Sequence, residues 1–520
     1  MANSAQAAVV ESGIIGLMDQ NLPPLIQALL EPQRYPDGTE HVELVQTHIS
    51  WLLLAGAFAY KIKKPVHLSF LDFSTLAQRQ LCCQEELRLN RRFASDIYLG
   101  VVGIFNTPQD PRFSGPGPAI EYAVKMRRFD EAGRLDRVCD RGELQPRHLS
   151  DLADTLVAFH AAAAVAPLTS RFGSAEQVLA PMLQTFDNLL RLLPTSNMQT
   201  RLAALQSWTE TQFKELRALL EARKRAGRVR ECHGDLHLAN LVLIDQKVRM
   251  FDCIEFSEYL RWIDVASEIA FSYVDLLAHG QPGLANWFVN EVLSRSGDYE
   301  AALVLRFYGV YRSLVRAKVA AIRIAQTQDD DGEVASYVAL AERLMAPPPL
   351  RLVITHGLSG CGKTVASTAL LQSDPQAATL RLRSDVQRKR LFTLSDTAPD
   401  GAGVNTGLYT PAASAATYSH LRELAALLLR AGWSVCVDAT FLKRAERETF
   451  RRLARETGAA FSILAPQATP AQLRERIQAR MVLGQDASEA TLDVLEQQLR
   501  TVEPLDANET LESLHENHVR

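Results

Sequence analysis

One short segment of the sequence combines glycines, a lysine and a threonine in a spacing that suits phosphate binding. It matches the pattern GxxxxGK[ST] and reads GLSGCGKT from Gly357 to Thr364. Glycines let successive backbone N–H groups turn toward one anion, while the lysine adds a cation and the threonine a hydroxyl for Mg²⁺. We therefore expect a nucleoside triphosphate here. The residues expected to hold it are Gly357, Ser359, Gly360, Cys361, Gly362, Lys363 and Thr364.

The elements on either side of this segment are those that such a loop needs. Leu350 to His356 is a short apolar run rich in β-forming residues, and Val365 to Gln372 has the composition of a helix. A helix that starts at the loop adds its partial positive charge to the anion site. In this arrangement Lys363 reaches the β- and γ-phosphates and Thr364 binds Mg²⁺.

Carboxylates and an arginine follow the next two predicted strands. The run Ala378 to Leu382 precedes Asp385, which can take the proton of an acceptor hydroxyl. Arg388 can hold an anionic group of that acceptor. The run Ser434 to Val437 ends in Asp438, which can contact Mg²⁺ or the acceptor. The residues expected to contact the acceptor are Arg388, Asp438 and Thr440.

A third group of candidates lies on a predicted helix from Ala471 to Arg480. Arg476 and Arg480 are four positions apart, so they share one helix face. Such a pair suits a lid that closes over a phosphoryl group during transfer and neutralises its charge. Arg474 on the same helix is either part of this lid or part of a solvated basic surface.

A further set of candidates lies much earlier in the chain. The segment HGDLHLAN contains Asp235 and Asn240, and Asp252 follows shortly after it. A carboxylate can accept a hydroxyl proton, while an amide and a second carboxylate hold Mg²⁺ against a triphosphate. A loop would present the first two residues, and a hairpin would return Asp252 to them. Glu255 either supplements this metal site or is a surface residue, and Asp264 is typical of a helix N-cap.

The form HGDLHxxN resembles the aminoglycoside phosphotransferase and choline kinase branch of the protein-kinase-like fold, over residues 40–345. The resemblance implies an α+β module in which Asp235 is the catalytic base and Asn240 and Asp252 are metal ligands. It also implies a hinge strand beside the adenine, for which Tyr122 to Arg128 is the candidate.

The same resemblance implies a phosphate-binding lysine on the third strand and a glutamate partner on the following helix. Lys61 fits the A-x-K pattern, with Lys63 as the second choice. Glu85 and Glu86 both qualify as its partner, and Glu86 is preferred. A glycine-rich loop before the second strand is absent, so Gln46 to Ser50 would have to cover the phosphates.

The later set resembles the polynucleotide-kinase branch of P-loop kinases, which includes zeta-toxin-like enzymes, over residues 350–505. The resemblance is carried by GLSGCGKT, by S-D-x-x-R ending at Arg388, by the run that starts at Asp438, and by R-x-x-x-R ending at Arg480. It implies an α/β P-loop kinase with a parallel sheet, Asp385 as general base, and Arg476 and Arg480 as lid arginines.

The segment Ala346-Pro347-Pro348-Pro349 is the clearest boundary in the chain, because a proline triplet cannot continue a helix. We predict two domains: residues 1–345 as an aminoglycoside phosphotransferase-like kinase domain and residues 351–520 as a P-loop kinase domain of AAA-type ATP binding. Residues 346–350 form the proline-rich linker. The whole chain resembles bacterial proteins that join two such modules.

The composition is that of a globular protein, with 520 residues of which 47% are hydrophobic and 22% charged. The net charge of -4 gives no general sign of a nucleic-acid or membrane partner, although it leaves a local basic groove open. No apolar run reaches the roughly 18 residues of a membrane span. The seven cysteines lack zinc-type spacing, and a reducing cytoplasm is expected.

These features predict an ATP- and Mg²⁺-dependent phosphotransferase with two nucleotide-binding modules. Its acceptor would be a hydroxyl of a small metabolite or of a nucleic-acid 5′ end at the C-terminal module. One alternative is a single active P-loop kinase that a non-catalytic kinase-like domain regulates. Another is a toxin-like or stress kinase that acts on a nucleotide sugar.

Overall fold

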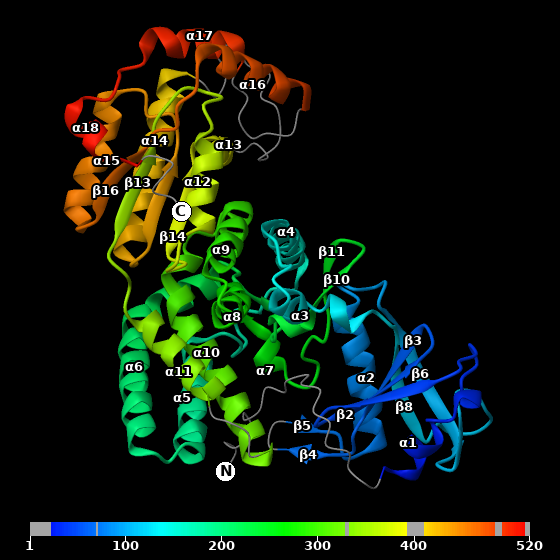
Figure 1. Ribbon diagram of the computed structural model, residues 1–520. Coiled ribbons are helices and arrows are strands. Elements are labelled where there is room, and N and C mark those ends of the chain that lie inside the picture. Colours follow the sequence, from blue (N-terminus) through cyan, green and yellow to red (C-terminus); the bar gives the residue numbers. More distant parts are fainter. Residues whose placement is uncertain (1–21, 69–70, 328–331, 393–409, 484–490, 515–520) are drawn as a thin grey trace. The chain divides into compact units, whose positions relative to one another are not determined.

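A computed structural model describes residues 22–68, 71–327, 332–392, 410–483 and 491–514 of the chain. These residues form two compact units, whose elements Figure 1 labels. The first unit takes the described residues up to His279 together with Val304–Met345. The second takes Gly280–Leu303 and the described residues from Ala346 onward. The segment Gly280–Leu303 therefore groups with the second unit although it precedes the proline triplet.

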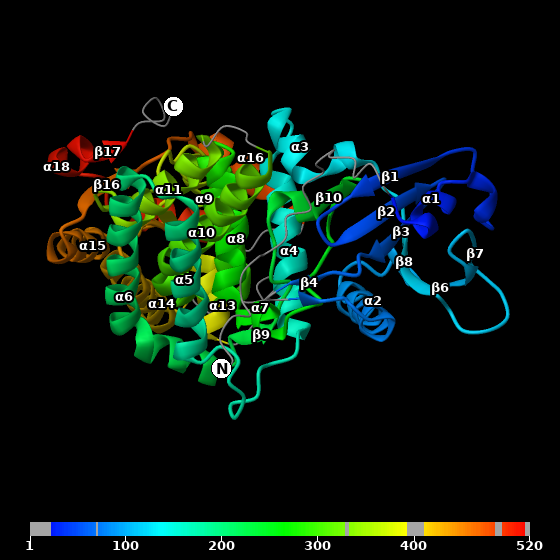
Figure 2. The same cartoon turned by 90° about the horizontal axis from the view of Figure 1, so that it is seen from below.

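A six-stranded antiparallel sheet lies near the start of the first unit. In order across the sheet, its strands are β1 (Val42–Gln46), β2 (Ser50–Ala55), β3 (Phe58–Lys63), β8 (Glu121–Arg127), β6 (Tyr98–Thr107) and β7 (Asp110–Arg112). Helix α2 (Leu76–Asn90) packs against β6 and β8, as Figure 1 and Figure 2 show.

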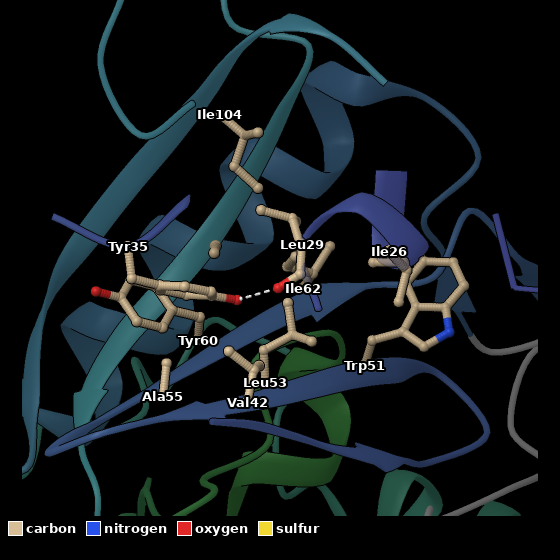
Figure 3. Close-up of a cluster of buried hydrophobic side chains, with 11 residues drawn as sticks. Ile26, Leu29, Tyr35, Val42, Trp51, Leu53, Ala55, Tyr60, Ile62 and Ile104 are labelled. Carbon is tan, nitrogen blue, oxygen red and sulfur yellow. Dashed lines mark hydrogen bonds between the residues drawn. The ribbon is translucent and has the colours of Figure 1, made fainter. Parts of the chain in front are cut away.

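One face of this sheet carries a buried apolar cluster, which Figure 3 shows. Tyr60 and Ile62 of β3 belong to it, as does Trp51 of β2. The Tyr35 hydroxyl closes one side of the cluster by donating to the carbonyl of Leu29 over 2.8 Å. The cluster anchors β3, because its even-numbered side chains are fixed on this face.

The opposite face of the sheet carries the functional candidates of β3. Successive residues of a strand point to opposite faces. Ala59 belongs to the cluster on this second face, together with Cys83 of α2. Lys61 and Lys63 follow at intervals of two residues, so they lie on the same face as Ala59, toward α2.

Two antiparallel strand pairs hold the loops that contain the acidic candidates of the first unit. β9 (Val229–Glu231) pairs with β12 (Trp262–Asp264), and β10 (Leu241–Ile244) pairs with β11 (Lys247–Met250). The hairpin expected before Asp252 is thus present. The longer helices are α4 (Pro146–Ala162), α5 (Ala175–Leu192), α6 (Ser196–Arg225), α8 (Val265–Ala278), α10 (Ala301–Thr327) and α11 (Gly332–Met345).

A parallel sheet forms the centre of the second unit, as the sequence predicts. Its five strands lie in the order β14-β15-β13-β16-β17. They are β14 (Thr379–Arg383), β15 (Ser434–Asp438), β13 (Arg351–Thr355), β16 (Ala460–Leu464) and β17 (Ser513–Leu514). The chain leaves β13 for the distant β14 and only then returns to β15. Ligands of such sheets bind at the carboxyl ends of the strands beside this reversal.

Helices cover this sheet and carry several of the candidate residues. They are α12 (Lys363–Gln372), α13 (Ser384–Leu391), α14 (Pro411–Arg430), α15 (Arg444–Thr457), α16 (Pro470–Leu483) and α17 (Leu492–Thr501). Helix α9 (Pro282–Ser296) packs in the same unit against α12 and β14. Among the described helices, none combines the length and the apolar character that a membrane crossing requires.

Candidate active sites

Lys61 bridges two carboxylates in the first unit. Its Nζ lies 2.9 Å from Glu86 Oε1 of α2 and 2.5 Å from Asp252 Oδ1. Glu86 is fully buried, and burial raises its pKa. The ammonium groups of Lys61 and Lys63 outweigh burial and hold the pKa of Glu86 below its ordinary value. Glu86 is therefore ionised at neutral pH and can orient Lys61 electrostatically.

Lys63 makes a separate and deeper pair of contacts. Its Nζ lies 2.7 Å from Glu86 Oε2 and also contacts the carboxylate of Glu255. Glu255 is only 7% exposed, so its interpretation as a surface residue is wrong. Glu85, the alternative partner for the lysine, instead pairs with Arg88 over 2.6 Å. Lys63 thus neutralises buried carboxylates, whereas Lys61 reaches the segment that contains the acidic candidates.

Asp235 and Asn240 are held together by the loop between β9 and β10. Asn240 Nδ2 donates to the carbonyl of Asp235 over 2.9 Å and to its Oδ2 over 3.2 Å. Oδ1 of Asp235 has no hydrogen-bond partner among the described residues, although Asp235 is only 4% exposed. The segment before Asp252 runs beside this loop, because the N–H of Phe251 donates to the Asn240 carbonyl over 3.0 Å. An open carboxylate oxygen in such a loop can accept a proton.

The imidazole of His237 lies beside this carboxylate. Its Nε2 lies 3.4 Å from Asp235 Oδ2. Burial raises the pKa of Asp235, but His237 outweighs burial, and the pKa lies below its ordinary value. Burial in turn lowers the pKa of His237, and Asp235 more than reverses that shift. Asp235 is therefore ionised at neutral pH, which is the form that a general base requires.

Three polar side chains on one face of α8 fasten the backbone of the same loop. Glu268 Oε1 accepts from two consecutive backbone N–H groups at the start of the loop, over 2.6 and 2.8 Å. Ser272 Oγ donates to the Leu236 carbonyl over 2.6 Å, and Asp275 Oδ2 accepts from the Leu238 N–H over 2.7 Å. Sequence reasoning missed these residues. The sequence feature that could have identified them is a set of polar side chains spaced three or four positions apart in an otherwise apolar helix.

Two residues of this site adopt the left-handed backbone conformation. Gly234 has φ +90°, and a Cβ on it would lie 2.8 Å from the Leu260 carbonyl oxygen. Asp252 has φ +62°, and its N–H donates to the Tyr98 hydroxyl over 3.0 Å. Non-glycine residues rarely adopt this conformation, and they do so preferentially where function constrains the backbone. Asp264, by comparison, caps α8 by accepting from the Ala266 N–H over 2.9 Å, as the N-cap interpretation predicts.

A small cavity of about 110 Å³ adjoins Lys61. Apolar side chains of β1, β2 and β8 line it, together with Lys61, Asp252 and Thr47, which lies in the segment expected to cover the phosphates. Arg127 and Arg128, at the end of the expected hinge strand, line it as well. The cavity therefore combines apolar walls with the charged side chains of Lys61 and Asp252 at its side.

In the second unit, the chain between β13 and α12 forms a tight glycine-rich turn. Gly360 and Gly362 have φ +84° and +101°. A Cβ on Gly360 would lie 3.1 Å from the carbonyl oxygen of Leu473 in α16, which is a tight contact, and the positive φ favours glycine at this position. Helix α12 begins at Lys363, whose Nζ donates to the Leu358 carbonyl over 2.8 Å. The turn, the helix N-terminus and the lysine together fit a triphosphate.

One cavity of about 1140 Å³ brings together most of the candidates of the second unit. Among the residues that line it are Ser359, Gly360, Cys361, Gly362, Lys363, Thr364, Asp385, Arg388, Asp438, Thr440 and Arg476. Gly357 precedes the lining residues at the start of the turn. The side chain of Arg480 lies outside the described residues. Ligand pockets commonly measure about 300–1,000 Å³, so this cavity has room for a nucleotide and a second molecule.

The acidic candidates enter this cavity from the carboxyl ends of two strands. Asp385 lies in the first turn of α13 and pairs with Arg388, with 3.6 Å between the carboxylate and the guanidinium. Asp438 ends β15, is 6% exposed, and accepts from the Ser367 hydroxyl of α12 over 3.2 Å. Thr440 follows, and its hydroxyl lies 3.4 Å from the Tyr418 hydroxyl.

Helix α16 contacts the glycine-rich turn. Arg476 Nη1 donates to the Gly360 carbonyl over 3.3 Å. An apolar cluster that includes Cys361 and Ile477 holds α16 against the turn. Arg474 pairs with Glu496 of α17 over 2.7 Å, and both side chains are exposed. Arg476 is therefore the described arginine of this helix that reaches the cavity.

Among the cavity-lining side chains that were not identified from the sequence, three make notable contacts or have a shifted pKa. Gln498 Oε1 accepts from the Ser359 N–H over 2.8 Å. Burial raises the pKa of Tyr418 to about 12, and its hydroxyl accepts from the Phe441 N–H over 3.1 Å. Burial also raises the pKa of Glu446. Gln498 and Tyr418 lie outside every stretch that carries the resemblance, so only the fold reveals them. Glu446 lies in the run that starts at Asp438, but nothing in that run distinguishes it as a cavity residue.

Comparisons with known proteins match the two regions of the chain to different family models. Residues 128–302 match the family model of the phosphotransferase enzyme family, and residues 352–505 match that of an AAA domain. Uncharacterized proteins of Mycobacterium tuberculosis and Mycobacterium bovis are each 28% identical over 451 residues, which cover 86% of this chain and 88% of theirs. A solved choline/ethanolamine kinase family protein from Mesorhizobium loti aligns with 62% of this chain and 96% of its own, at 12% identity and TM-score 0.38.

The two family models bear on different parts of the candidate sites. The phosphotransferase model spans the loop of Asp235 and Asn240 as well as Asp252, while Lys61 and Glu86 lie before its start. The AAA model spans the glycine-rich turn, Asp385, Asp438 and both arginines of the expected lid. The matches confirm the resemblance of the chain to a phosphotransferase and, in a separate region, to a P-loop protein.

Proposed function

We propose that the second unit is an ATP-dependent kinase that transfers the γ-phosphoryl group to a hydroxyl. The observation that supports this most strongly is the convergence of Lys363, Asp385, Asp438 and Arg476 on one cavity. Phosphoryl transfer depends mainly on positioning and on neutralising charge, and these four residues supply a cation, two carboxylates and a second cation.

Each residue has a role that follows from its place in the cavity. Lys363 binds the β- and γ-phosphates, and Thr364 and Asp438 would hold Mg²⁺, which neutralises phosphate charge when bound. Asp385 accepts the hydroxyl proton of the acceptor. Arg476 of α16 lies against the turn and neutralises charge on the transferring group, together with Arg480.

The acceptor of this unit is a hydroxyl of a small metabolite or of a nucleic-acid 5′ end. Arg388 supports an acceptor with an anionic group, because its guanidinium lies 3.6 Å from the Asp385 carboxylate and lines the same cavity. An acceptor hydroxyl bound at Asp385 would thus place a neighbouring phosphate or carboxylate near Arg388.

The first unit is proposed to be a second phosphotransferase. Asp235 would be its base, Asn240 and Asp252 its metal ligands, and Lys61, oriented by Glu86, its phosphate-binding cation. The open Oδ1 of buried Asp235 and the contact of Lys61 with both Glu86 and Asp252 support these roles.

A regulatory role for the first unit is the second candidate. Its cavity of about 110 Å³ is far smaller than the roughly 300 Å³ at which ligand pockets begin. A unit of this kind would bind a fragment of a nucleotide, such as its base, without transferring phosphate, and its occupancy would control the second unit.

Labelled ATP tests the proposed function of the second unit. The full-length chain is incubated with γ-labelled ATP, Mg²⁺ and, in parallel, RNA, DNA and a metabolite extract. We expect label to enter an acceptor, and the Lys363→Ala variant to lose the part of the transfer that the second unit catalyses. A parent chain that labels no oligonucleotide 5′ end would contradict the nucleic-acid acceptor. A Lys363→Ala variant that labels every acceptor as the parent does would contradict the site itself.

A further inference from the structure

A buried chain of polar groups runs beneath the P-loop site of the second unit. Arg381 of β14 is 7% exposed, and Ser367 of α12 is fully buried. Arg381 Nη1 lies 3.2 Å from Ser367 Oγ. The same hydroxyl lies 3.2 Å from Asp438 Oδ2 and 3.1 Å from the Thr364 carbonyl oxygen. One serine thus joins a buried cation to a carboxylate of the cavity and to the helix turn of Thr364.

The direction of these hydrogen bonds follows from their chemistry. A guanidinium can only donate, so Ser367 Oγ accepts from Arg381 and its own hydrogen is directed elsewhere. The two acceptors within reach are the Asp438 carboxylate and the Thr364 carbonyl. The Ser367 hydroxyl therefore holds Asp438 beside Thr364. This places the Asp438 carboxylate on the side of the cavity where Mg²⁺ is expected. Burial lowers the pKa of Arg381, and the Asp438 carboxylate opposes that shift.

Helix α9 fixes Arg381 from the other side. Asn290 Oδ1 accepts from the Arg381 N–H over 2.6 Å, and Asn290 Nδ2 donates to the Thr379 carbonyl over 2.9 Å. β14 is the edge strand of the sheet, so one amide side chain pairs the two outward-facing groups that a further strand would otherwise pair. The guanidinium carbon of Arg381 also lies 5.5 Å from the centre of the Trp287 ring.

The same face of α9 contacts the end of α12. Asn286 Nδ2 donates to the Leu371 carbonyl over 3.0 Å. A Cβ on Gly283 would lie 1.8 Å from the Gln372 carbonyl oxygen, so only glycine permits this approach. Gly283, Asn286 and Asn290 share one helix face. α9 therefore fixes both β14, which carries Arg381, and α12, which carries Ser367 and Thr364.

We propose that Arg381 is a positioning residue of the P-loop site. Through Ser367 it holds the Asp438 carboxylate beside Thr364 for Mg²⁺, and α9 fixes Arg381 in the place where it does so. This inference rests on the proposed function of the second unit. In this proposal, the partner of Asp438 is the metal rather than the acceptor.

Binding of AMP-PNP to the full-length chain, titrated calorimetrically with EDTA and over a range of Mg²⁺ concentrations, tests this proposal. The Lys363→Ala chain defines the part of the signal that does not arise at the P-loop. We expect Ser367→Ala to reduce the Mg²⁺-dependent gain in affinity about tenfold, as expected for a lost hydrogen bond to a charged group, and to leave the affinity in EDTA unchanged. Asp438→Asn and Arg381→Lys should change it in the same direction.

Ser373→Ala is the matched control, because Ser373 is the exposed C-cap residue of α12 and its hydroxyl donates to the carbonyls of Ala369 and Leu370. It should bind as the parent does. The proposal is overturned if Ser367→Ala retains the full Mg²⁺ effect, or if it loses affinity equally in EDTA, which would indicate a purely structural role. Thermal unfolding of each variant shows whether it is folded. If Lys363→Ala binds AMP-PNP as the parent does, the proposed function fails first, and this inference with it.

Discussion

Two lysines two residues apart on β3 have different environments in the first unit. Lys61 Nζ reaches Asp252 and lines the cavity, while Lys63 is fully buried between Glu86 and Glu255. The alternation of side chains along the strand places both lysines on one face of the sheet. They differ in burial, because Lys61 lines the cavity whereas Lys63 does not. Their substitutions should therefore have different effects.

We expect Lys63→Met to destabilise the first unit by about 3–5 kcal/mol, because it leaves buried Glu255 without its cation and Glu86 with Lys61 alone. Lys61→Met should cost less stability and should instead weaken nucleotide binding to the first unit. Urea unfolding and AMP-PNP titration of both variants measure the two effects. Equal losses of stability would contradict the distinction between the two lysines.

Asp385 gives a residue-scale prediction for the second unit. Asp385→Asn should lower the rate of phosphoryl transfer by about 10²–10⁴-fold, because it removes the proposed base while it keeps the size of the side chain. The affinity for AMP-PNP should stay close to that of the parent. Steady-state kinetics and titration measure both. Asp493→Asn on the exposed first turn of α17 is the control, and an unchanged rate in Asp385→Asn would contradict the assignment.

The sequence predicts single residues best where one chemical pattern requires them. Asp235 and Asn240 lie in one short segment, and the structure joins them by two hydrogen bonds. Glu255 shows the limit of this reasoning. Its burial depends on Lys63, far away in the chain, and no local pattern distinguishes a buried glutamate from a surface one.

At the scale of elements, α8 determines the geometry of the loop of Asp235. Its residue Glu268 accepts two backbone N–H groups of the loop and pairs with His160 over 2.6 Å. Burial raises the pKa of Glu268, but His160 and the backbone donors outweigh burial, and the pKa lies below its ordinary value. A carboxyl group whose pKa is lower in the folded state than in the unfolded state stabilises the fold at pH values above its ordinary pKa. This stabilisation is lost as the pH falls through the pKa of the folded state.

Glu268→Gln should therefore lower the free energy of unfolding by about 2 kcal/mol at neutral pH, since it replaces a charged acceptor with a neutral one. The difference from the parent should shrink in acid, below the ordinary carboxyl range, where the parent glutamate becomes protonated. Urea unfolding at several pH values measures this. Glu215→Gln, at an exposed position of α6, should be nearly neutral. A stability difference for Glu268→Gln that stays constant into acid would contradict the role of the Glu268 charge.

Elements whose signals are local were predicted well. The apolar run, the glycine turn and the helix around Lys363 appear in the structure as β13, the turn and α12. Helix α9 could not be assigned in this way. Residues 285–293 are buried on every side of the helix, and the packing of α9 on β14 depends on Asn290 meeting a strand edge about 90 residues later in the chain.

For the whole molecule, the two units carry separate sets of residues for related chemistry. The first has the Lys61, Glu86 and Asp252 contacts, and the second has the cavity around Lys363 and Asp385. The matches to a phosphotransferase family model and to an AAA model fall in these two regions. The sequence predicts both resemblances because each has a compact motif, whereas the acceptors depend on cavity walls drawn from many segments.

Both units are proposed to transfer phosphate, and one set of variants of the full-length chain tests this directly. Release of label from γ-labelled ATP, in the presence of the acceptors found for the parent, is measured for the full-length parent, Asp235→Asn, Lys363→Ala and the double variant. We predict that each single variant loses a distinct part of the turnover and that the double variant loses essentially all of it. Full turnover in Asp235→Asn under every acceptor condition, with none left in Lys363→Ala, would contradict the claim and favour a regulatory first unit.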